Sequence, residues 1–133
     1  TKPIPGDSPV LLCDAQSKQI LDVQLLNVLP NPPEAGKNIT VEAYGTLSQT
    51  IEKGAYVELN VRYGMIQLIK QTVDLCDELK HVDKKCPIEK GPVSFLKEIA
   101  LPDAIPPGIY SVVAQAYTYD DQEIACVTAT VKF

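Results

Sequence analysis

Apolar and polar residues alternate with a period of two along much of this chain. The clearest case is residues 39–47, where Ile, Val, Ala, Gly and Leu alternate with Thr, Glu and Tyr. Residues 21–25, 57–63 and 125–133 follow the same rule. Successive side chains of a β-strand point to opposite faces, so each run predicts a strand with one buried face.

Turn-forming residues separate these runs, and most of the 11 prolines lie between them, as central strands require. No stretch shows a helical period. The pattern predicts about seven strands, chosen from eight candidate segments of which the first is the weakest: 10–15, 20–29, 39–48, 56–63, 66–75, 94–101, 109–119 and 124–133. Short strands at this spacing indicate an all-β fold, an immunoglobulin-like two-sheet β-sandwich, and we expect residues 1–133 to form one domain.

The expected core is unusual because many inward positions carry small side chains. The chain has no Trp, and Phe95 and Phe133 are its only Phe residues. Packed sheets stand about 10 Å apart, so small facing side chains cannot fill the space between them. Either larger Leu, Ile and Val residues close that space, or it holds an apolar molecule. The small residues are Ala43, Gly45, Ala114, Ala116, Ala125 and Ala129.

Charge and cysteine content narrow the classes of function. The formal net charge is -5 and the basic residues are scattered, which argues against a nucleic-acid partner. No apolar run approaches the roughly 18 residues of a membrane-spanning helix. The even number of cysteines, 4 in a short chain, is typical of disulfides formed in an oxidising compartment, and three pairings are possible.

The sequence contains no convincing motif for a metal site or a catalytic site. The cysteines lack the short spacing of zinc sites, and His81 is the only histidine, so we expect no metal. The carboxylates Asp120, Asp121 and Glu123 lack the spacing of a calcium loop and fit an exposed turn. We therefore predict that the protein is not an enzyme. Asn38 begins the sequon Asn-Ile-Thr and is a predicted glycosylation site.

Four local motifs resemble the ML lipid-recognition domain family, and among its members the soluble Niemann-Pick type C sterol-transfer proteins, in particular their fungal branch. Together the motifs extend over residues 12–133. This sequence differs from animal members, which carry a third disulfide in the proline turn and another pocket-entrance segment in place of residues 66–75. The motifs are Leu12-Cys13-Asp14 with Ile124-Ala125-Cys126, Leu29-Pro30-Asn31-Pro32-Pro33 with Gly36, Cys76 with Cys86-Pro87-Ile88-Glu89-Lys90, and Ile105-Pro106-Pro107-Gly108-Ile109-Tyr110.

The resemblance implies a sterol-sized lipid cavity between the sheets and the disulfides Cys13–Cys126 and Cys76–Cys86. It also implies residence in the lumen of a vacuole or lysosome, or secretion. We expect a monomer that binds one lipid and needs no cofactor. Its partners would be membranes, touched transiently, and a membrane-resident Niemann-Pick type C sterol transporter.

Alternation and the resemblance together give the candidate lipid-binding residues, although each of them alone also fits ordinary core packing. The penultimate strand is ambiguous, since either Val112, Ala114 and Ala116 or Val113 and Tyr117 face inward. For the mouth we expect Ile69, Val73, Leu101 and Ile105, with Ile105 either exposed on a proline-stiffened loop or buried as the anchor of that loop. The wall candidates are Val41, Ala43, Leu59, Val61, Tyr63, Ala114, Ala116, Ala125, Val127, Ala129 and Val131.

Three functions remain open at this point. The first is sterol binding and transfer, because a rigid apolar ligand suits a wall of Val, Leu, Ile and Ala. The second is transfer of phosphatidylinositol or phosphatidylglycerol, as described for fungal relatives. The third is a recognition module without a lipid, which would have a closed and filled interior.

Overall fold

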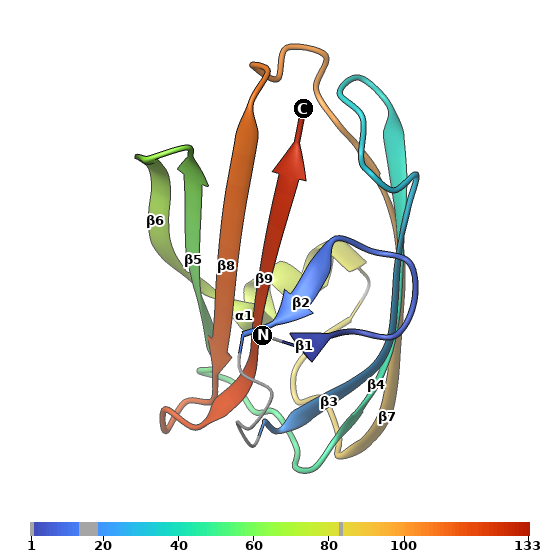
Figure 1. Ribbon diagram of the computed structural model, residues 1–133. Helices are drawn as coiled ribbons and strands as arrows, with labels where there is room; N and C mark the ends of the chain where they lie inside the picture. The colour runs from blue at the N-terminus through green and yellow to red at the C-terminus, as the bar shows by residue number, and fades with distance from the viewer. Residues whose placement is uncertain (1, 14–18, 83) are drawn as a thin grey trace.

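The computed structural model describes residues 2–13, 19–82 and 84–133 (Figure 1). Strands account for most of this part of the chain, and two short helical turns follow the sixth strand. The elements are β1 (Lys2–Pro3), β2 (Val10–Leu12), β3 (Leu21–Leu29), β4 (Asn38–Leu47), β5 (Tyr56–Tyr63), β6 (Ile66–Asp74), α1 (Leu75–Glu78), the 3₁₀-helix η1 (Leu79–Val82), β7 (Gly91–Ala100), β8 (Ile109–Tyr117) and β9 (Glu123–Lys132).

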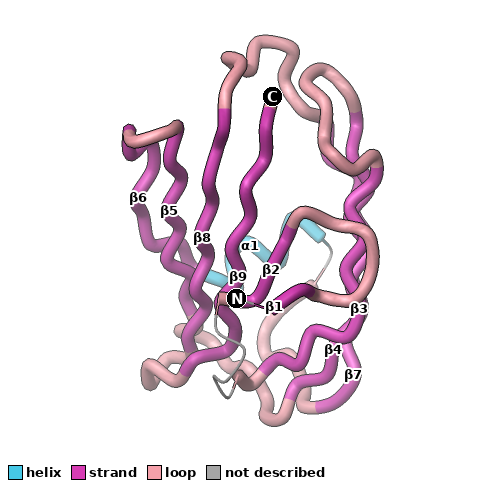
Figure 2. The backbone as a smooth tube through the Cα atoms, viewed as in Figure 1, coloured by secondary structure: helices cyan, strands magenta, loops and turns pink. Residues whose placement is uncertain are grey.

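The strands form two antiparallel sheets that face each other, as Figure 2 shows. One sheet has the order β1-β2-β9-β8-β5-β6, and the other has the order β3-β4-β7. The predicted all-β two-sheet sandwich is therefore confirmed. All the predicted strands are present, although residues 14 and 15 of the first lie outside the described part of the chain. The pattern missed β1, which is too short to show alternation.

The register of the large sheet decides which residues face inward. Directly opposite residues of antiparallel strands share a face. Ala116 lies opposite both Val57 and Ala125, and Ala114 lies opposite both Leu59 and Val127. The penultimate strand thus turns Val112, Ala114 and Ala116 toward the other sheet, which resolves the ambiguity left by the sequence.

A bulge in β3 overturns one part of the alternation. The register shifts between Val23 and Leu25, so that Leu25 lies opposite Tyr44 while Leu26 lies opposite Ala43. Leu26 therefore takes the inward position that strict alternation gave to Leu25. An extra residue in one strand exchanges the faces on which all later side chains of that strand lie. Nothing in this run of residues indicates the bulge.

The tightest packing lies at one end of the sandwich, where β3 begins and β4 ends. Ile51 is only 1% exposed and is the largest fully buried side chain among the described residues. It pairs with Ile88 in an isolated β-bridge, which ties the segment after the helical turns to this end. The rest of this buried cluster consists of Ile20, Leu47, Ala55 and Ile124.

Both disulfides implied by the family resemblance are present. Cys13 and Cys126 join the segment after β2 to β9, with their Cα atoms 5.4 Å apart. Cys76 and Cys86 close the loop that contains α1 and η1, with their Cα atoms 5.6 Å apart. One bridge therefore fixes the edge of the large sheet, and the other fixes the connection between the two sheets.

The helical segments α1 and η1 were not predicted, because four residues are too few to show a period of 3.6. The Asp74 side chain caps α1 by accepting a hydrogen bond of 3.1 Å from the Asp77 amide. His81 lies in η1. Within the described residues, no helix combines the length and apolar character needed to cross a bilayer.

A phenol–carboxylate hydrogen bond ties β5 to the β8–β9 turn and makes the stability depend on pH. Tyr56 Oη donates to Asp121 Oδ1 at 2.5 Å. This bond and, to a smaller extent, burial raise the pKa of Tyr56 from 10.0 to about 12. The unfolded chain releases this proton first, so the stabilisation is complete below pH 10.0 and is lost as the pH rises to about 12.

We expect the urea midpoint to fall across this alkaline range, and to fall less in Tyr56→Phe, which lacks the titrating group. Denaturant titrations of both proteins at several pH values test this. Identical pH slopes in the two proteins would contradict the assignment.

Candidate functional site

A large apolar cavity lies between the two sheets. Its volume is about 620 Å³, within the range of pockets that hold small-molecule ligands. The alternation predicted either this cavity or a filled core, and the cavity is present. Its lining residues are Ile4, Val10, Leu21, Val23, Leu26, Ala43, Tyr44, Gly45, Leu47, Ile51, Leu75, Leu79, Lys84, Ile88, Pro92, Val93, Ser94, Phe95, Ala116, Ile124, Ala125 and Val127.

Small residues on facing strands leave the space open. Ala43 projects from the central strand of the small sheet between Leu26 and Phe95, its neighbours on β3 and β7. Across the gap, Ala116 and Ala125 lie opposite each other on β8 and β9. None of these three Ala side chains can reach far into the roughly 10 Å between packed sheets, so a cavity forms instead of an interdigitated core.

A third wall comes from the segment between the two sheets. Leu75 and Leu79, four residues apart, and Ile88 all line the cavity. The Cys76–Cys86 disulfide closes this segment, and the Ile51–Ile88 bridge anchors it. The wall was missed at the sequence level, although the Leu-x3-Leu spacing on a helical turn was a usable signal.

The polar part of the lining is confined to one place. In the part of the chain that the structure describes, the polar lining residues are Tyr44, Lys84 and Ser94, and Lys84 is the charged one. The side chains of Tyr44 and Ser94 belong to directly opposite positions of β4 and β7. Both positions alternate with the inward Ala43 and Phe95, so their side chains project from the outer face of the small sheet. The apolar cavity therefore has its polar margin around β7, which is an edge strand of that sheet.

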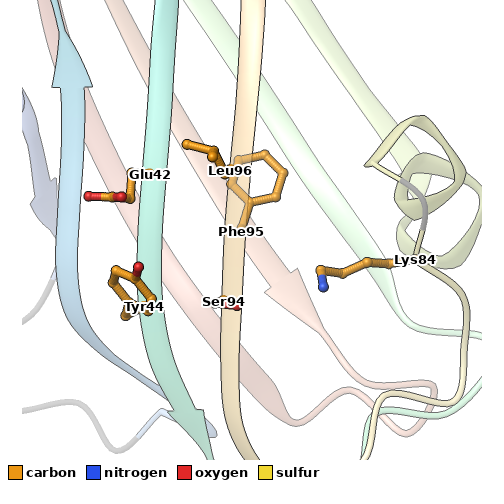
Figure 3. A pocket seen from close by; sticks show the side chains of 6 residues that line it. All are labelled: Glu42, Tyr44, Lys84, Ser94, Phe95 and Leu96. Carbon is orange, nitrogen blue, oxygen red and sulfur yellow. The ribbon is translucent and has the colours of Figure 1, made fainter.

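A second pocket of about 370 Å³ continues this polar margin (Figure 3). It shares Tyr44, Lys84, Ser94 and Phe95 with the large cavity, and Glu42 and Leu96 complete it. Figure 3 shows Lys84 extending from the segment after η1 toward β7. We call this polar margin the β7 rim, defined by Glu42, Tyr44, Lys84, Ser94, Phe95 and Leu96.

The predicted wall is only partly in the cavity lining. Ala43, Ala116, Ala125 and Val127 line it. Leu59 and Ala114 share the inward face by register but are not lining residues. The remaining candidates on the large sheet, also outside the lining, lie on the same face farther along the strands: Val61, Tyr63, Ala129 and Val131.

Aromatic rings occupy the end of the sandwich where those remaining candidates lie. Tyr63 and Tyr110 have ring centroids 5.0 Å apart, and Tyr110 and Phe133 have centroids 5.7 Å apart. Tyr63 Oη also donates to the Pro107 carbonyl at 2.5 Å. The three rings therefore pack together at the end of the large sheet where the lining stops, short of Val131.

The predicted mouth residues do not line the cavity either. Ile69 is 41% exposed on β6, and Val73 is half-buried on the same strand. Leu101 and Ile105 are half-buried in the β7–β8 connection, so Ile105 lies between the exposed residue and the buried anchor that were the two alternatives.

Val41, the last wall candidate, also lies outside the lining. On the neighbouring strands it lies opposite Val28, which is buried, and opposite Lys97.

The sequon asparagine lies at the start of β4. Asn38 is exposed, and its Nδ2 donates to Glu98 Oε1 at 2.8 Å. An enzyme could reach this side chain without unfolding the sheet, so glycosylation of Asn38 stays a prediction. Among the residues that the structure describes, no group of three or more His, Cys, Asp or Glu side chains could hold a metal ion.

Known proteins resemble this chain both in sequence and in fold. A phosphatidylglycerol/phosphatidylinositol transfer protein of Candida albicans is 56% identical over 133 residues, covering 100% of this chain and 69% of the relative. A protein of the same name from Yarrowia lipolytica is 52% identical over 130 residues, covering 98% of this chain and 69% of the relative.

Solved structures share the fold at low sequence identity. Chicken MD-1 complexed with lipid IVa has a TM-score of 0.62 at 17% identity, over 93% of this chain and 88% of MD-1. A Niemann-Pick type C2 protein from Japanese carpenter ant has a TM-score of 0.59 at 17% identity, over 92% of this chain and 98% of the other. The ML domain profile matches residues 7–133, nearly all of the chain. Sequence and fold agree, and the chain belongs to the ML domain family.

Proposed function

We propose that this protein binds one glycerophospholipid between its sheets and transfers it between membranes, with phosphatidylinositol and phosphatidylglycerol as its preferred cargo. The observation that carries the proposal is the apolar cavity of about 620 Å³ that ends in the polar β7 rim. An amphiphile needs both parts, because its chains leave water while its headgroup keeps polar contacts. The names of the Candida and Yarrowia relatives support this choice of lipid.

Transfer from water into the cavity supplies the main free energy. Each Å² of apolar surface removed from water contributes about 25 cal/mol, and the walls offer Ala, Val, Leu and Ile side chains over most of their area. The protein needs no covalent step to act as a carrier. We therefore retain the prediction that it is a binding protein and not an enzyme.

Sterol is the second candidate cargo, favoured by the same apolar lining. A rigid ring system needs surface contact and few hydrogen bonds, and it loses little conformational entropy on binding. For this cargo we would also retain a membrane-resident sterol transporter as the receiving partner. A sterol would leave most polar groups of the β7 rim without a hydrogen-bond partner. The rim therefore favours the phospholipid.

The deciding experiment is competition binding to the delipidated protein. A fluorescent phosphatidylinositol is titrated at about pH 5 and about pH 7, and is then displaced by unlabelled phosphatidylinositol, phosphatidylglycerol or sterol. We expect one-to-one binding that the two phospholipids displace most strongly. Displacement mainly by sterol would move the assignment to the second candidate, and absence of binding by the folded, oxidised protein would overturn both.

An apolar hairpin tip is the part of the surface best suited to touch a membrane. Met65 is 94% exposed and Ile66 is 61% exposed at the β5–β6 turn. Residues 59–73 contain Arg62 and Lys70 but no acidic residue, although the whole chain carries a charge of -5. Apolar side chains beside positive charge suit the surface of an anionic bilayer.

We expect Met65→Asp to slow lipid transfer between vesicles about tenfold, because a charge at the tip opposes both insertion and attraction to anionic lipid. Equilibrium lipid affinity should stay unchanged, since Met65 does not line the cavity. Vesicle-to-vesicle transfer of a fluorescent phospholipid measures the rate, and competition binding measures the affinity.

Tyr119→Asp is the matched control for the hairpin tip. Tyr119 is 61% exposed on the β8–β9 turn, at the opposite end of the sandwich from the β5–β6 turn (Figure 1). Its replacement adds the same charge to an exposed bulky residue. Equal slowing by both variants would show that the hairpin tip has no special role in membrane contact.

We also propose the cellular compartment in which the protein acts. Two disulfides and a reachable sequon fit a protein that passes through the secretory pathway and acts in a vacuolar or lysosomal lumen or after secretion. The acidic chain should repel anionic membranes less as the pH falls and its carboxylates gain protons. Transfer to anionic vesicles should then be faster at about pH 5 than at about pH 7.

A further inference from the structure

Among the described residues, Lys84 is the one charged side chain in the lining of the cavity. It also lines the shallow pocket that continues the cavity at β7, so it stands where the apolar interior meets the outside. Figure 3 shows its side chain directed at the edge of β7, beside Phe95. A headgroup attached to chains inside the cavity can reach the outside at this point.

The Lys84 ammonium has no carboxylate partner among the residues that the structure describes. It takes no part in the ion pairs that join Lys37 to Glu34 and Lys80 to Asp77. The Lys84 backbone is fixed independently, because its amide donates to the Leu79 carbonyl at 3.0 Å. An exposed cation on a fixed backbone, without an internal partner, is suited to an external anion.

The rest of the β7 rim offers groups that suit a headgroup carrying hydroxyls. Glu42 accepts a hydrogen bond of 3.1 Å from Asn27 Nδ2 through its Oε1 atom. Its other carboxylate oxygen, together with the hydroxyls of Tyr44 and Ser94, adds hydrogen-bonding capacity to the same pocket. A phosphate at Lys84 with a polyol beyond it matches this order of groups.

We propose that Lys84 binds the phosphodiester of a phospholipid whose acyl chains occupy the cavity, and that the β7 rim receives the polyol headgroup. This inference rests on the proposed function and names the residue that gives it headgroup recognition. Lysine supplies a point charge with three donors, which phosphate oxygens accept without a demanding geometry. A sterol has no phosphate and gains nothing from this cation.

The test compares Lys84→Gln with Lys85→Gln. Lys85 is the adjacent residue, is exposed and does not line the cavity. We expect Lys84→Gln to weaken binding of phosphatidylinositol and phosphatidylglycerol about fivefold, a modest loss because the contact is partly exposed to water. Sterol binding should change less than about twofold, and Lys85→Gln should match the unsubstituted protein. Unchanged melting temperatures establish that each variant is folded.

Separate outcomes identify which idea has failed. If the unsubstituted protein binds no phospholipid, the proposed function falls and this inference falls with it. If it binds phospholipid and Lys84→Gln behaves like Lys85→Gln, the proposed function stands and the role of Lys84 is overturned.

A further arm uses glycerophosphoinositol, which has the headgroup but no acyl chains. We expect it not to compete at lipid-equivalent concentrations, because the chains supply most of the binding free energy. Equal competition by this soluble ester would overturn the lipid assignment in favour of a free phosphate ester site.

Discussion

Replacing Ala43 with Trp should remove lipid binding while leaving the sandwich folded. Ala43 lies on the central strand of the small sheet and points into the cavity between Leu26 and Phe95. An indole there would occupy the space that a ligand's chains need. We expect the affinity for phosphatidylinositol to fall more than about tenfold, a loss of about 1.4 kcal/mol or more. Titration of a fluorescent phospholipid measures this loss.

The cost to stability should be small for a buried Ala→Trp change. Overpacking a dense core costs about 1–3 kcal/mol, because neighbours must leave their preferred rotamers. Here the ring enters a cavity of about 620 Å³, so we expect a cost at or below the lower end of that range. A loss of urea stability well above about 3 kcal/mol would show that this space is filled in solution.

Ala100→Trp is the control for the cavity-filling variant. Ala100 is exposed at the end of β7, opposite Asn38, and its side chain does not line the cavity. It should retain the phospholipid affinity of the unsubstituted protein. Equal affinity in Ala43→Trp and Ala100→Trp would mean that the ligand binds elsewhere, and it would remove the basis of the proposed function.

The fold followed from alternation because each half-buried strand repeats the same local rule. The runs at 39–47, 57–63 and 125–133 all became strands with the expected inward face, and cross-strand partners such as Ala116 and Ala125 kept it. The rule failed where the chain inserts an extra residue, as at the bulge before Leu25. A bulge depends on twist and on the partner strand, and neither is written in the local pattern.

The extent of the cavity could not be read from the sequence for a different reason. Alternation gives the face of a residue but not its position along the sandwich. Val131 and Val127 share a face, yet Val127 lines the cavity while Val131 lies at the end where the rings of Tyr63 and Tyr110 pack together. Lys84 could not be singled out from the sequence, because the role proposed for it depends on which strand edge its loop crosses.

The two disulfides should differ in what their removal costs. In the chain-entropy model, a bridge stabilises by restricting the unfolded chain, more so for longer loops. The Cys13–Cys126 bridge closes 113 residues, and the Cys76–Cys86 bridge closes 10. These lengths correspond to about 5 and about 3 kcal/mol of free energy of unfolding, before any strain is subtracted. Urea denaturation of Cys13→Ser/Cys126→Ser and Cys76→Ser/Cys86→Ser measures both losses.

Ligand binding should reverse this order, because the short bridge belongs to the site and the long one does not. Leu75, Leu79 and Ile88 form the third wall of the cavity, and the Cys76–Cys86 bridge closes the loop that carries them. We expect its removal to weaken phospholipid binding more than removal of Cys13–Cys126 does, at a temperature where both variants are folded. If the two variants bind equally, the third wall keeps its shape without the covalent clip, and the Ile51–Ile88 bridge alone is sufficient to hold it.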